Sequence, residues 1–246
     1  MPLPSREEFL AAFGMSEPEK RRGTGINFPA KFIPFDERHR GLPKLHYGVV
    51  FCMAPDALMG VDTPRERFIG YDDRRAALMF TDGACLNNGQ PNAKAGWAVW
   101  FGPEHEARTI FGRLEHKGPF GDVGEQTSNR AELRAAIAGL RCLPWIEDGY
   151  NRVVIASDSE YLVEGATAWL KKWIANGWNT ARGDAVKNKD LWEMLLGEVE
   201  RYHEARVVVD FWKILREYNV IADRGAKEGA EMPDEQEFVD IMVPGI

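Results

Sequence analysis

From about residue 76 onward, short apolar runs alternate with longer amphipathic segments along the chain. Three strand-like runs separated by Gly, Asn and Pro clusters predict a meander of strands, at 77–85, 95–101 and 108–114. Apolar residues then recur at helical spacing between Leu133 and Leu140. Two further strands are predicted at 152–156 and 206–212, and three further helices at about 160–176, 188–202 and 219–230. The order β-β-β-α-β-α-α-β-α predicts an α/β fold, with a five-stranded mixed sheet and helices on both of its faces.

The first 75 residues differ from the rest of the chain in composition and in hydrophobic pattern. Eight of the fourteen prolines lie within the first 70 residues, and little periodicity survives beyond a candidate helix at 6–13 and a short strand at 47–52. We therefore expect residues 1–75 to be an irregular, proline-rich extension. Its aromatic side chains indicate that parts of it pack on the main domain: Phe28, Phe32, Phe35, Tyr47 and Phe51. The expected organisation is this extension, a main domain at 76–231, and an acidic-apolar tail at 232–246 that predicts no function.

Composition narrows the class of protein. The 246 residues are 44% hydrophobic, enough for one large domain with an appendage. No apolar run is as long as a membrane span, which needs about 18 residues. The N-terminal MPLPSREEFL lacks the apolar stretch of a secretory signal. Three cysteines without a CxxC pair argue against a disulfide framework or a structural zinc. We expect an intracellular monomer in a reducing compartment, cytoplasmic or nuclear, without membrane association.

Two aspartates lie where predicted buried strands end. Asp82 follows the apolar run at 77–80, and a carboxylate there is costly unless something compensates it. The alternative is an Asp-Gly hairpin turn. Asp158 follows the strand at 152–156 and precedes a helix, where it could instead be an N-cap.

Two further acids lie near predicted helix starts. Glu132 is early in its helix, at the margin of the apolar stripe, where an ordinary first-turn glutamate would also suit the helix dipole. Asp223 lies near the start of the last helix, and a surface i,i+4 ion pair with Lys227 is the simpler explanation for it.

Taken together, the four acids predict a metal site. In α/β sheets, ligands gather beyond the carboxyl ends of the parallel strands, so this topology could bring the acids to one point. Four crowded carboxylates repel one another unless cations lie between them. Oxygen ligands without a matching His or Cys set favour Mg²⁺ or Mn²⁺ over zinc. Two such ions about 3.5–4 Å apart are suited to in-line displacement at phosphorus.

Six collinear motifs resemble type 1 ribonuclease H and cover residues 76–231, about two-thirds of the chain. They are TDGACLNNG (81–89), AGWAV (95–99), EQTSNRAEL (125–133), SDSEYLVEGATAWLKKWIANGW (157–178), VKNKDLW (186–192) and NVIADRGAKEGA (219–230). The resemblance implies the ribonuclease H-like fold and an endonuclease that cuts the RNA strand of RNA–DNA hybrids. It also implies that the metal-binding and catalytic carboxylates are Asp82, Glu132, Asp158 and Asp223. Their cofactor would be two Mg²⁺ ions, with Mn²⁺ as a substitute.

The same resemblance assigns substrate-binding residues. Asn88 and Asn129 would contact minor-groove edges and ribose 2′-hydroxyls of the RNA strand. Thr127 and Asn188 would hold a phosphate of the DNA strand. Trp169 and Trp173 would form the aromatic wall of the DNA channel, although core packing at i,i+4 would also explain two tryptophans at this spacing.

Some positions depart from the family pattern. Glu125 and Ser128 stand where basic and asparagine residues are common, and Ile174 and Ala175 replace lysines. Many members carry a mobile loop with a histidine before the last helix. Here FWKILREYN (211–219) is short and lacks histidine, which resembles a short-loop branch of the family. Arg216 is the candidate to contact the scissile phosphate instead, and the alternative is a solvent-facing arginine.

The net charge of −7 is an objection to nucleic-acid binding, which draws most of its affinity from phosphate contacts. Residues 76–231 contain 19 Lys and Arg against 23 Asp and Glu, a net −4 that two divalent cations would bring to about neutral. We therefore predict a hydrolase that leaves 5′-phosphate and 3′-hydroxyl ends. Two alternatives remain open: a catalytically silent hybrid- or RNA-binding module of the same fold, and a related metal-dependent exonuclease.

Overall fold

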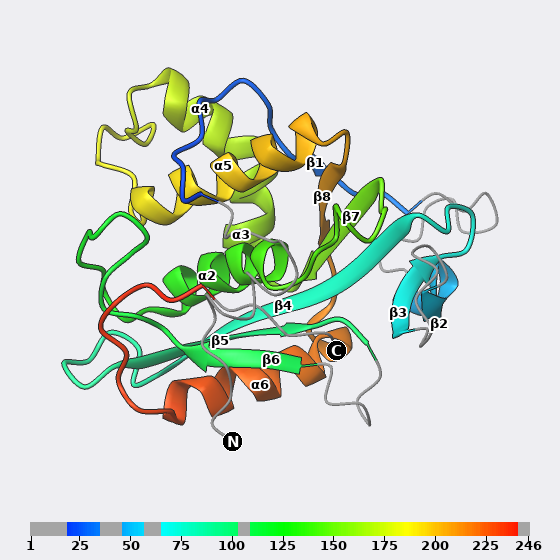
Figure 1. The fold of residues 1–246 in the computed structure, drawn as a ribbon. Helices are drawn as coiled ribbons and strands as arrows, with labels where there is room; N and C mark the ends of the chain where they lie inside the picture. The colour runs from blue at the N-terminus through cyan, green and yellow to red at the C-terminus, as the bar shows by residue number, and fades with distance from the viewer. Residues whose placement is uncertain (1–18, 35–45, 57–64, 103–108, 241–246) are drawn as a thin grey trace.

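A mixed β-sheet crosses the centre of the computed structural model, which describes residues 19–34, 46–56, 65–102 and 109–240 (Figure 1). Its strands are β1 (Ala30–Lys31), β2 (Phe51–Asp56), β3 (Arg65–Gly70), β4 (Ala76–Leu86), β5 (Lys94–Trp100), β6 (Thr109–Arg113), β7 (Arg152–Ser157) and β8 (Val208–Lys213). They follow the order β1-β8-β7-β4-β3-β2, while β5 pairs with β4 and β6 pairs with β5. The five strands predicted from the sequence are β4 to β8, and their mixed pairing is as expected.

Strand β4 is the central strand and divides the sheet. Along one edge, Ala76–Phe80 pairs in parallel with β7. Along the other edge β4 first meets β3, at Ala77 and Leu78, and then β5 from Phe80 to Leu86. Strand β4 therefore continues past the end of its pairing with β7, and Asp82 lies on that continuation.

Helices cover both faces of the sheet (Figure 1). They are α2 (Ser128–Arg141), α3 (Glu160–Glu164), α4 (Leu170–Ala175), α5 (Lys189–Glu204) and α6 (Val220–Glu231). Side chains alternate along β4, so that Ala77 and Met79 share a core with α2 and α5, whereas Leu78 and Phe80 share a second core with α6. A π-helical turn at Gly165–Trp169 joins α3 to α4, in place of the single helix predicted at 160–176.

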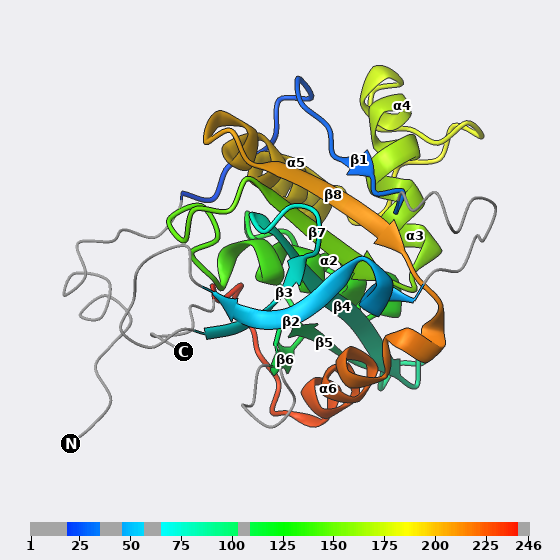
Figure 2. The same ribbon diagram turned by 90° about the vertical axis from the view of Figure 1, so that its right-hand side faces the viewer.

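The described parts of the N-terminal extension, residues 19–34, 46–56 and 65–75, are more regular than we expected. Strands β2 and β3 form a hairpin-like pair on β4, and β1 pairs in parallel with β8, so the described sheet has eight strands rather than five (Figure 2). The expected strand at 47–52 begins only at Phe51, after a short 3-10 helix at Tyr47–Val49. The physical reason is burial, since Phe51 and Phe68 cover apolar residues of β4 that would otherwise face water. The candidate helix at 6–13 lies outside the described residues.

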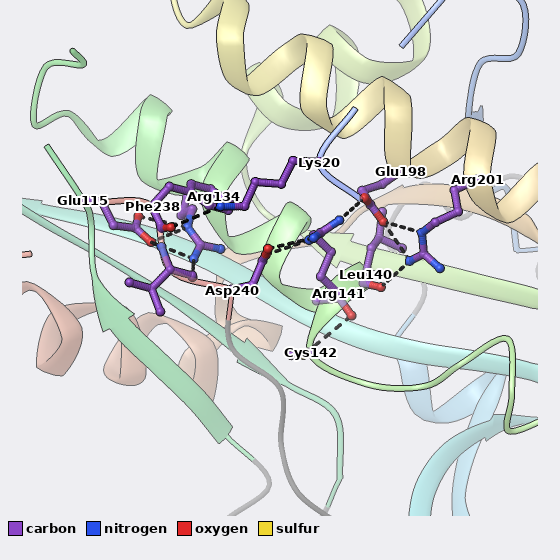
Figure 3. A network of polar contacts seen from close by, with 12 residues as sticks. Lys20, Glu115, Arg134, Leu140, Arg141, Cys142, Glu198, Arg201, Phe238 and Asp240 are labelled. Carbon is purple, nitrogen blue, oxygen red and sulfur yellow. Dashed lines mark hydrogen bonds and ion pairs between the residues drawn. The ribbon is translucent and has the colours of Figure 1, made fainter. Parts of the chain in front are cut away.

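The described part of the tail, residues 232–240, also belongs to the fold, although its sequence predicted nothing. Asp240 accepts two hydrogen bonds of 2.7 Å from the buried guanidinium of Arg141, which also pairs with Glu198 (Figure 3). Nearby, Arg134 pairs with the buried Glu115 at 2.7 Å and donates to the Val239 carbonyl at 2.6 Å. These buried charges are paired, as low-dielectric surroundings require, and they fix the tail against α2 and α5.

None of the helices in the described ranges is long and apolar enough to cross a membrane.

Candidate active site

Strand register brings Asp82 and Asp158 together. Phe80 of β4 pairs with Ala156 of β7. Asp82 and Asp158 each come two residues later, and because side chains alternate along a strand, both lie on the same side of the sheet. The Asp-Gly hairpin interpretation of Asp82 is wrong, because the residue lies inside the eleven-residue β4. The N-cap interpretation of Asp158 is also wrong, because Ser159 caps α3 by accepting a hydrogen bond from the Leu162 amide.

Helices α2 and α6 supply the other two acids. Glu132 lies in the first turns of α2, whose N-cap is Thr127. A Cβ on Gly83 would lie only 2.2 Å from the Glu132 amide nitrogen, so glycine at position 83 is what allows α2 to approach β4 this closely. Asp223 lies in the first turn of α6 and pairs with Lys227 at 2.6 Å, so the predicted i,i+4 ion pair exists beside the site.

The electrostatics show that the four carboxylates interact. Burial raises the pKa of Asp82 to about 7, and the negative charges of Asp158 and Asp223 add to the rise. Burial also raises the pKa of Glu132 well above its usual value, again with contributions from Asp82 and Asp158. Each acid is therefore close enough to disfavour ionisation of another.

Asn219 joins two of the acids and was not predicted. Its fully buried amide donates to Asp158 Oδ1 at 2.7 Å, to the Thr81 carbonyl at 3.0 Å and to Asp82 Oδ1 at 3.5 Å. In the sequence, an asparagine just before a helix indicates an N-cap. Its side chain makes no capping hydrogen bond and turns into the site instead.

These residues fit a hard divalent cation. Glu132 Oε2 is buried, and no hydrogen-bond partner for it exists among the described residues. Carboxylate oxygens with no imidazole or thiol beside them suit magnesium-like ions. No three acidic, His or Cys side chains in the described ranges form a ready-made metal site.

Four of the predicted substrate-binding residues line one cavity of about 390 Å³: Asn88, Thr127, Asn129 and Asn188. Its wall includes a buried ion pair between Arg130 and Asp190, with hydrogen bonds of 2.8 and 2.6 Å. The cavity is therefore lined by many polar side chains, and Arg130 and Asp190 in its wall neutralise each other.

The two predicted tryptophans lie side by side on the π turn and α4. The ring centroids of Trp169 and Trp173 are 5.8 Å apart, and Trp173 also packs edge-on against Trp192 of α5 at 5.5 Å. Both side chains are partly buried, and Trp173 packs against the main core. The core-packing alternative therefore accounts for part of the position of Trp173.

The short segment between β8 and α6 contains Arg216 and no histidine, as the sequence indicated. The side chain of Arg216 is 77% exposed and lies 3.3 Å from Asp223, so it stands at the rim of the acid cluster. The extension contacts the same short segment, because the ring of His46 packs against Tyr218 with centroids 4.7 Å apart. Sequence reasoning missed this contact, since residues 46 and 218 share no local pattern.

The mixed sheet, with Asp82 on β4 beyond its pairing with β7 and Asp158 directly after β7, defines a ribonuclease H-like α/β protein. The RNase H family profile matches residues 74–231, and the chain belongs to that family. A "Ribonuclease H" of Acidithiobacillus ferrooxidans is 41% identical over 124 residues, which are 50% of this chain and 68% of that protein. A "Ribonuclease HI" of Haemophilus ducreyi is 37% identical over 164 residues, 65% of this chain and 93% of that protein.

One solved structure similar to this chain is LC9-RNase H1, described as a type 1 RNase H with the type 2 active-site motif. It is 26% identical, covers 63% of this chain and 72% of its own, and has a TM-score of 0.45. Family membership confirms the predicted fold class and the enzyme class, a ribonuclease H.

Proposed function

We propose that Asp82, Glu132, Asp158 and Asp223 are the catalytic carboxylates with which this ribonuclease H hydrolyses the RNA strand of RNA–DNA hybrids. Enzymes of this family are endonucleases of such hybrids and depend on divalent metal ions. The observation that carries the assignment is the convergence of the acids, in which Asp82 and Asp158 share one buried amide, that of Asn219. A protein that only bound hybrids would have no need of so unfavourable a cluster.

The same four side chains would hold the divalent cations, which we propose are two Mg²⁺ ions with Mn²⁺ as a substitute. Bound there, such cations supply Lewis acidity that lowers the pKa of water and offsets charge at phosphorus. The chain's own contribution is position and charge. Asn219 fixes Asp158 by its 2.7 Å hydrogen bond, and Lys227 and Arg216 balance Asp223 from the solvent side.

Substrate recognition is proposed for the polar cavity and the tryptophan pair. Asn88 and Asn129 offer amide donors and acceptors suited to ribose 2′-hydroxyls, the groups that distinguish RNA from DNA. Thr127 and Asn188 line the same cavity and would hold a phosphate of the DNA strand. Trp169 and Trp173 would pack along that strand, and Arg216 would contact the scissile phosphate.

Cleavage of an internally labelled hybrid with both ends blocked tests this function. The wild-type protein should cut the RNA strand with Mg²⁺ or Mn²⁺ but not with EDTA, leaving 5′-phosphate and 3′-hydroxyl ends. Asp158→Asn should abolish cleavage without unfolding the protein, while the exposed Asp184→Asn serves as a matched control. Cleavage only from free ends would indicate an exonuclease instead, and binding without cleavage would indicate a silent module.

We further infer a monomer working in a reducing intracellular compartment. Cys52, Cys85 and Cys142 are all free thiols, which supports the choice of compartment.

A further inference from the structure

A segment that precedes the family match packs on the helices that carry the proposed substrate wall. We call residues 20–31 the strap, and residues 160–175, from α3 through α4, the arm. Figures 1 and 2 show the strap, in dark blue, running beside α5 and reaching the arm. The family profile begins only at residue 74, so the strap lies outside the part of the chain that the family shares.

Glu200 of α5 anchors the strap. Its carboxylate accepts hydrogen bonds from the Thr24 amide at 2.8 Å, the Thr24 hydroxyl at 2.9 Å and the Gly25 amide at 2.9 Å. The Ile26 amide adds a fourth at 3.1 Å. Although burial opposes it, these bonds lower the pKa of Glu200. Hydrogen bonds to an ionised acceptor are among the stronger ones in proteins, and this cluster gathers four within three consecutive residues.

Paired glycines let the strap lie directly on α5. The Gly23 amide donates to the Glu193 carbonyl at 2.8 Å. A Cβ on Gly23 would lie 2.5 Å from Leu196 Cγ, and one on Gly197 would lie 2.3 Å from the Arg21 carbonyl oxygen. Neither position has room for a side chain, so the strap and α5 are in backbone-to-backbone contact.

Beyond this anchor the strap contacts the arm. The Cβ position of Gly25 lies 3.3 Å from Ile174 of α4, and Phe28 packs on the same core as Ile174. Lys31 pairs with Glu164 of α3. The arm consists of two helices of five and six residues joined by a π-helical turn. Such short helices have little stability of their own, so their orientation depends on what they pack against.

We propose that the strap is a brace for hybrid binding: Glu200 fixes it to α5, and through Gly25, Phe28 and Lys31 it holds the arm so that Trp169 and Trp173 face the substrate. This inference rests on the proposed role of the two tryptophans. Glu200 is then a positioning residue. Its loss should weaken hybrid binding and leave the chemistry at the four carboxylates nearly unchanged.

Glu200→Ala tests the brace, with Glu200→Gln as the conservative variant. The alanine variant should raise the KM and Kd for hybrids at least about three-fold and change kcat by less than about two-fold. The glutamine variant keeps one acceptor oxygen and should fall between alanine and wild type. Asp184→Ala is the control, because Asp184 is an exposed acid that lies outside both the strap and α5.

Limited trypsin digestion reports the strap independently, because Lys20, Arg21 and Arg22 are cleavage sites within it. Glu200→Ala should be cut there faster than wild type or Asp184→Ala. Unchanged cleavage would show that Glu200 is not the anchor. Faster cleavage with unchanged KM and Kd would show that the strap does not act on binding. Either result overturns the proposal.

Trp169→Ala, measured in parallel, separates the brace from the function on which it rests. If Trp169→Ala leaves Kd unchanged, the substrate wall is wrong and the brace with it. If the wild type binds hybrids without cutting them, the proposed function fails, while the Kd comparison between Glu200→Ala and Asp184→Ala still decides the brace.

Discussion

Replacing Asp82 with asparagine should stabilise the metal-free protein at pH 8 while abolishing cleavage. Burial, with help from Asp158 and Asp223, raises the folded-state pKa of Asp82 from 3.8 to about 7. The folded protein therefore holds this proton more tightly than the unfolded chain does. The stability contributed by the protonated carboxyl is fully present below about pH 4 and is lost as the pH rises through 7. Asparagine is neutral at every pH and avoids that loss.

The size of the effect follows from the shift. A rise of about three pKa units corresponds to about 4 kcal/mol at 1.36 kcal/mol per unit, which is the upper limit for the gain. The repulsion is shared with Glu132, whose own pKa is raised in part by Asp82. We therefore expect a gain of about 2 kcal/mol at pH 8, or about 4–8 °C in Tm for a chain of this size. The asparagine oxygen can still accept the Asn219 hydrogen bond.

Thermal and urea unfolding in EDTA at pH 5, 6, 7 and 8 measure the effect. The gap in the free energy of unfolding between Asp82→Asn and wild type should grow across this range. Saturating Mg²⁺ should narrow or reverse it, because the cation stabilises only the protein that binds it. Asp184→Asn, an exposed acid, should show no such trend. A gap that is absent at pH 8, or equal at all pH values, would refute the raised pKa and with it the crowding of the carboxylates.

Four further changes probe the rest of the molecule. Arg216→Ala should lower kcat on hybrids several-fold in both Mg²⁺ and Mn²⁺. Its Tm should change little, because the Arg216 side chain is mostly exposed. Unchanged kinetics would remove Arg216 from the mechanism. Asn219→Ala removes the buried amide that holds Asp82 and Asp158, the two aspartates proposed as catalytic. Its kcat should fall at least about ten-fold, and its stability by about 1–3 kcal/mol, measured by urea unfolding. Asp240→Ala removes the carboxylate that accepts two hydrogen bonds from the buried Arg141, so the free energy of unfolding, measured in urea, should fall by about 3–5 kcal/mol. A fall of less than about 1 kcal/mol, as for a surface ion pair, would contradict the buried network. A chain beginning at Asp72 lacks β1, β2, β3 and the strap, so its Tm should fall sharply, and a Tm equal to that of the full chain would show that the extension adds no stability.

The sequence by itself determined the main sheet and its helices, and it singled out the four acids as candidates. Strands β4 to β8 were predicted because each is a short apolar run bounded by glycine, asparagine or proline, a pattern that depends on neighbouring residues alone. Asp82 and Asp158 were singled out because a carboxylate directly after a buried strand is unfavourable without a compensating partner. Chain order and strand type then placed the acids at one edge of the sheet.

Only the tertiary structure decided the roles of the extension, the tail and Asn219. Strands β2 and β3 pair with β4, and the strap is fixed by Glu200, about 175 residues away in sequence, in contacts that no periodicity within either segment encodes. Asp240 and Arg141 resemble surface charges in the sequence, yet each is buried and satisfied by the other. Short-range patterns reveal how a segment folds locally. The partner of a buried polar group depends on which distant segments the core brings together, and that is settled only when the whole chain packs.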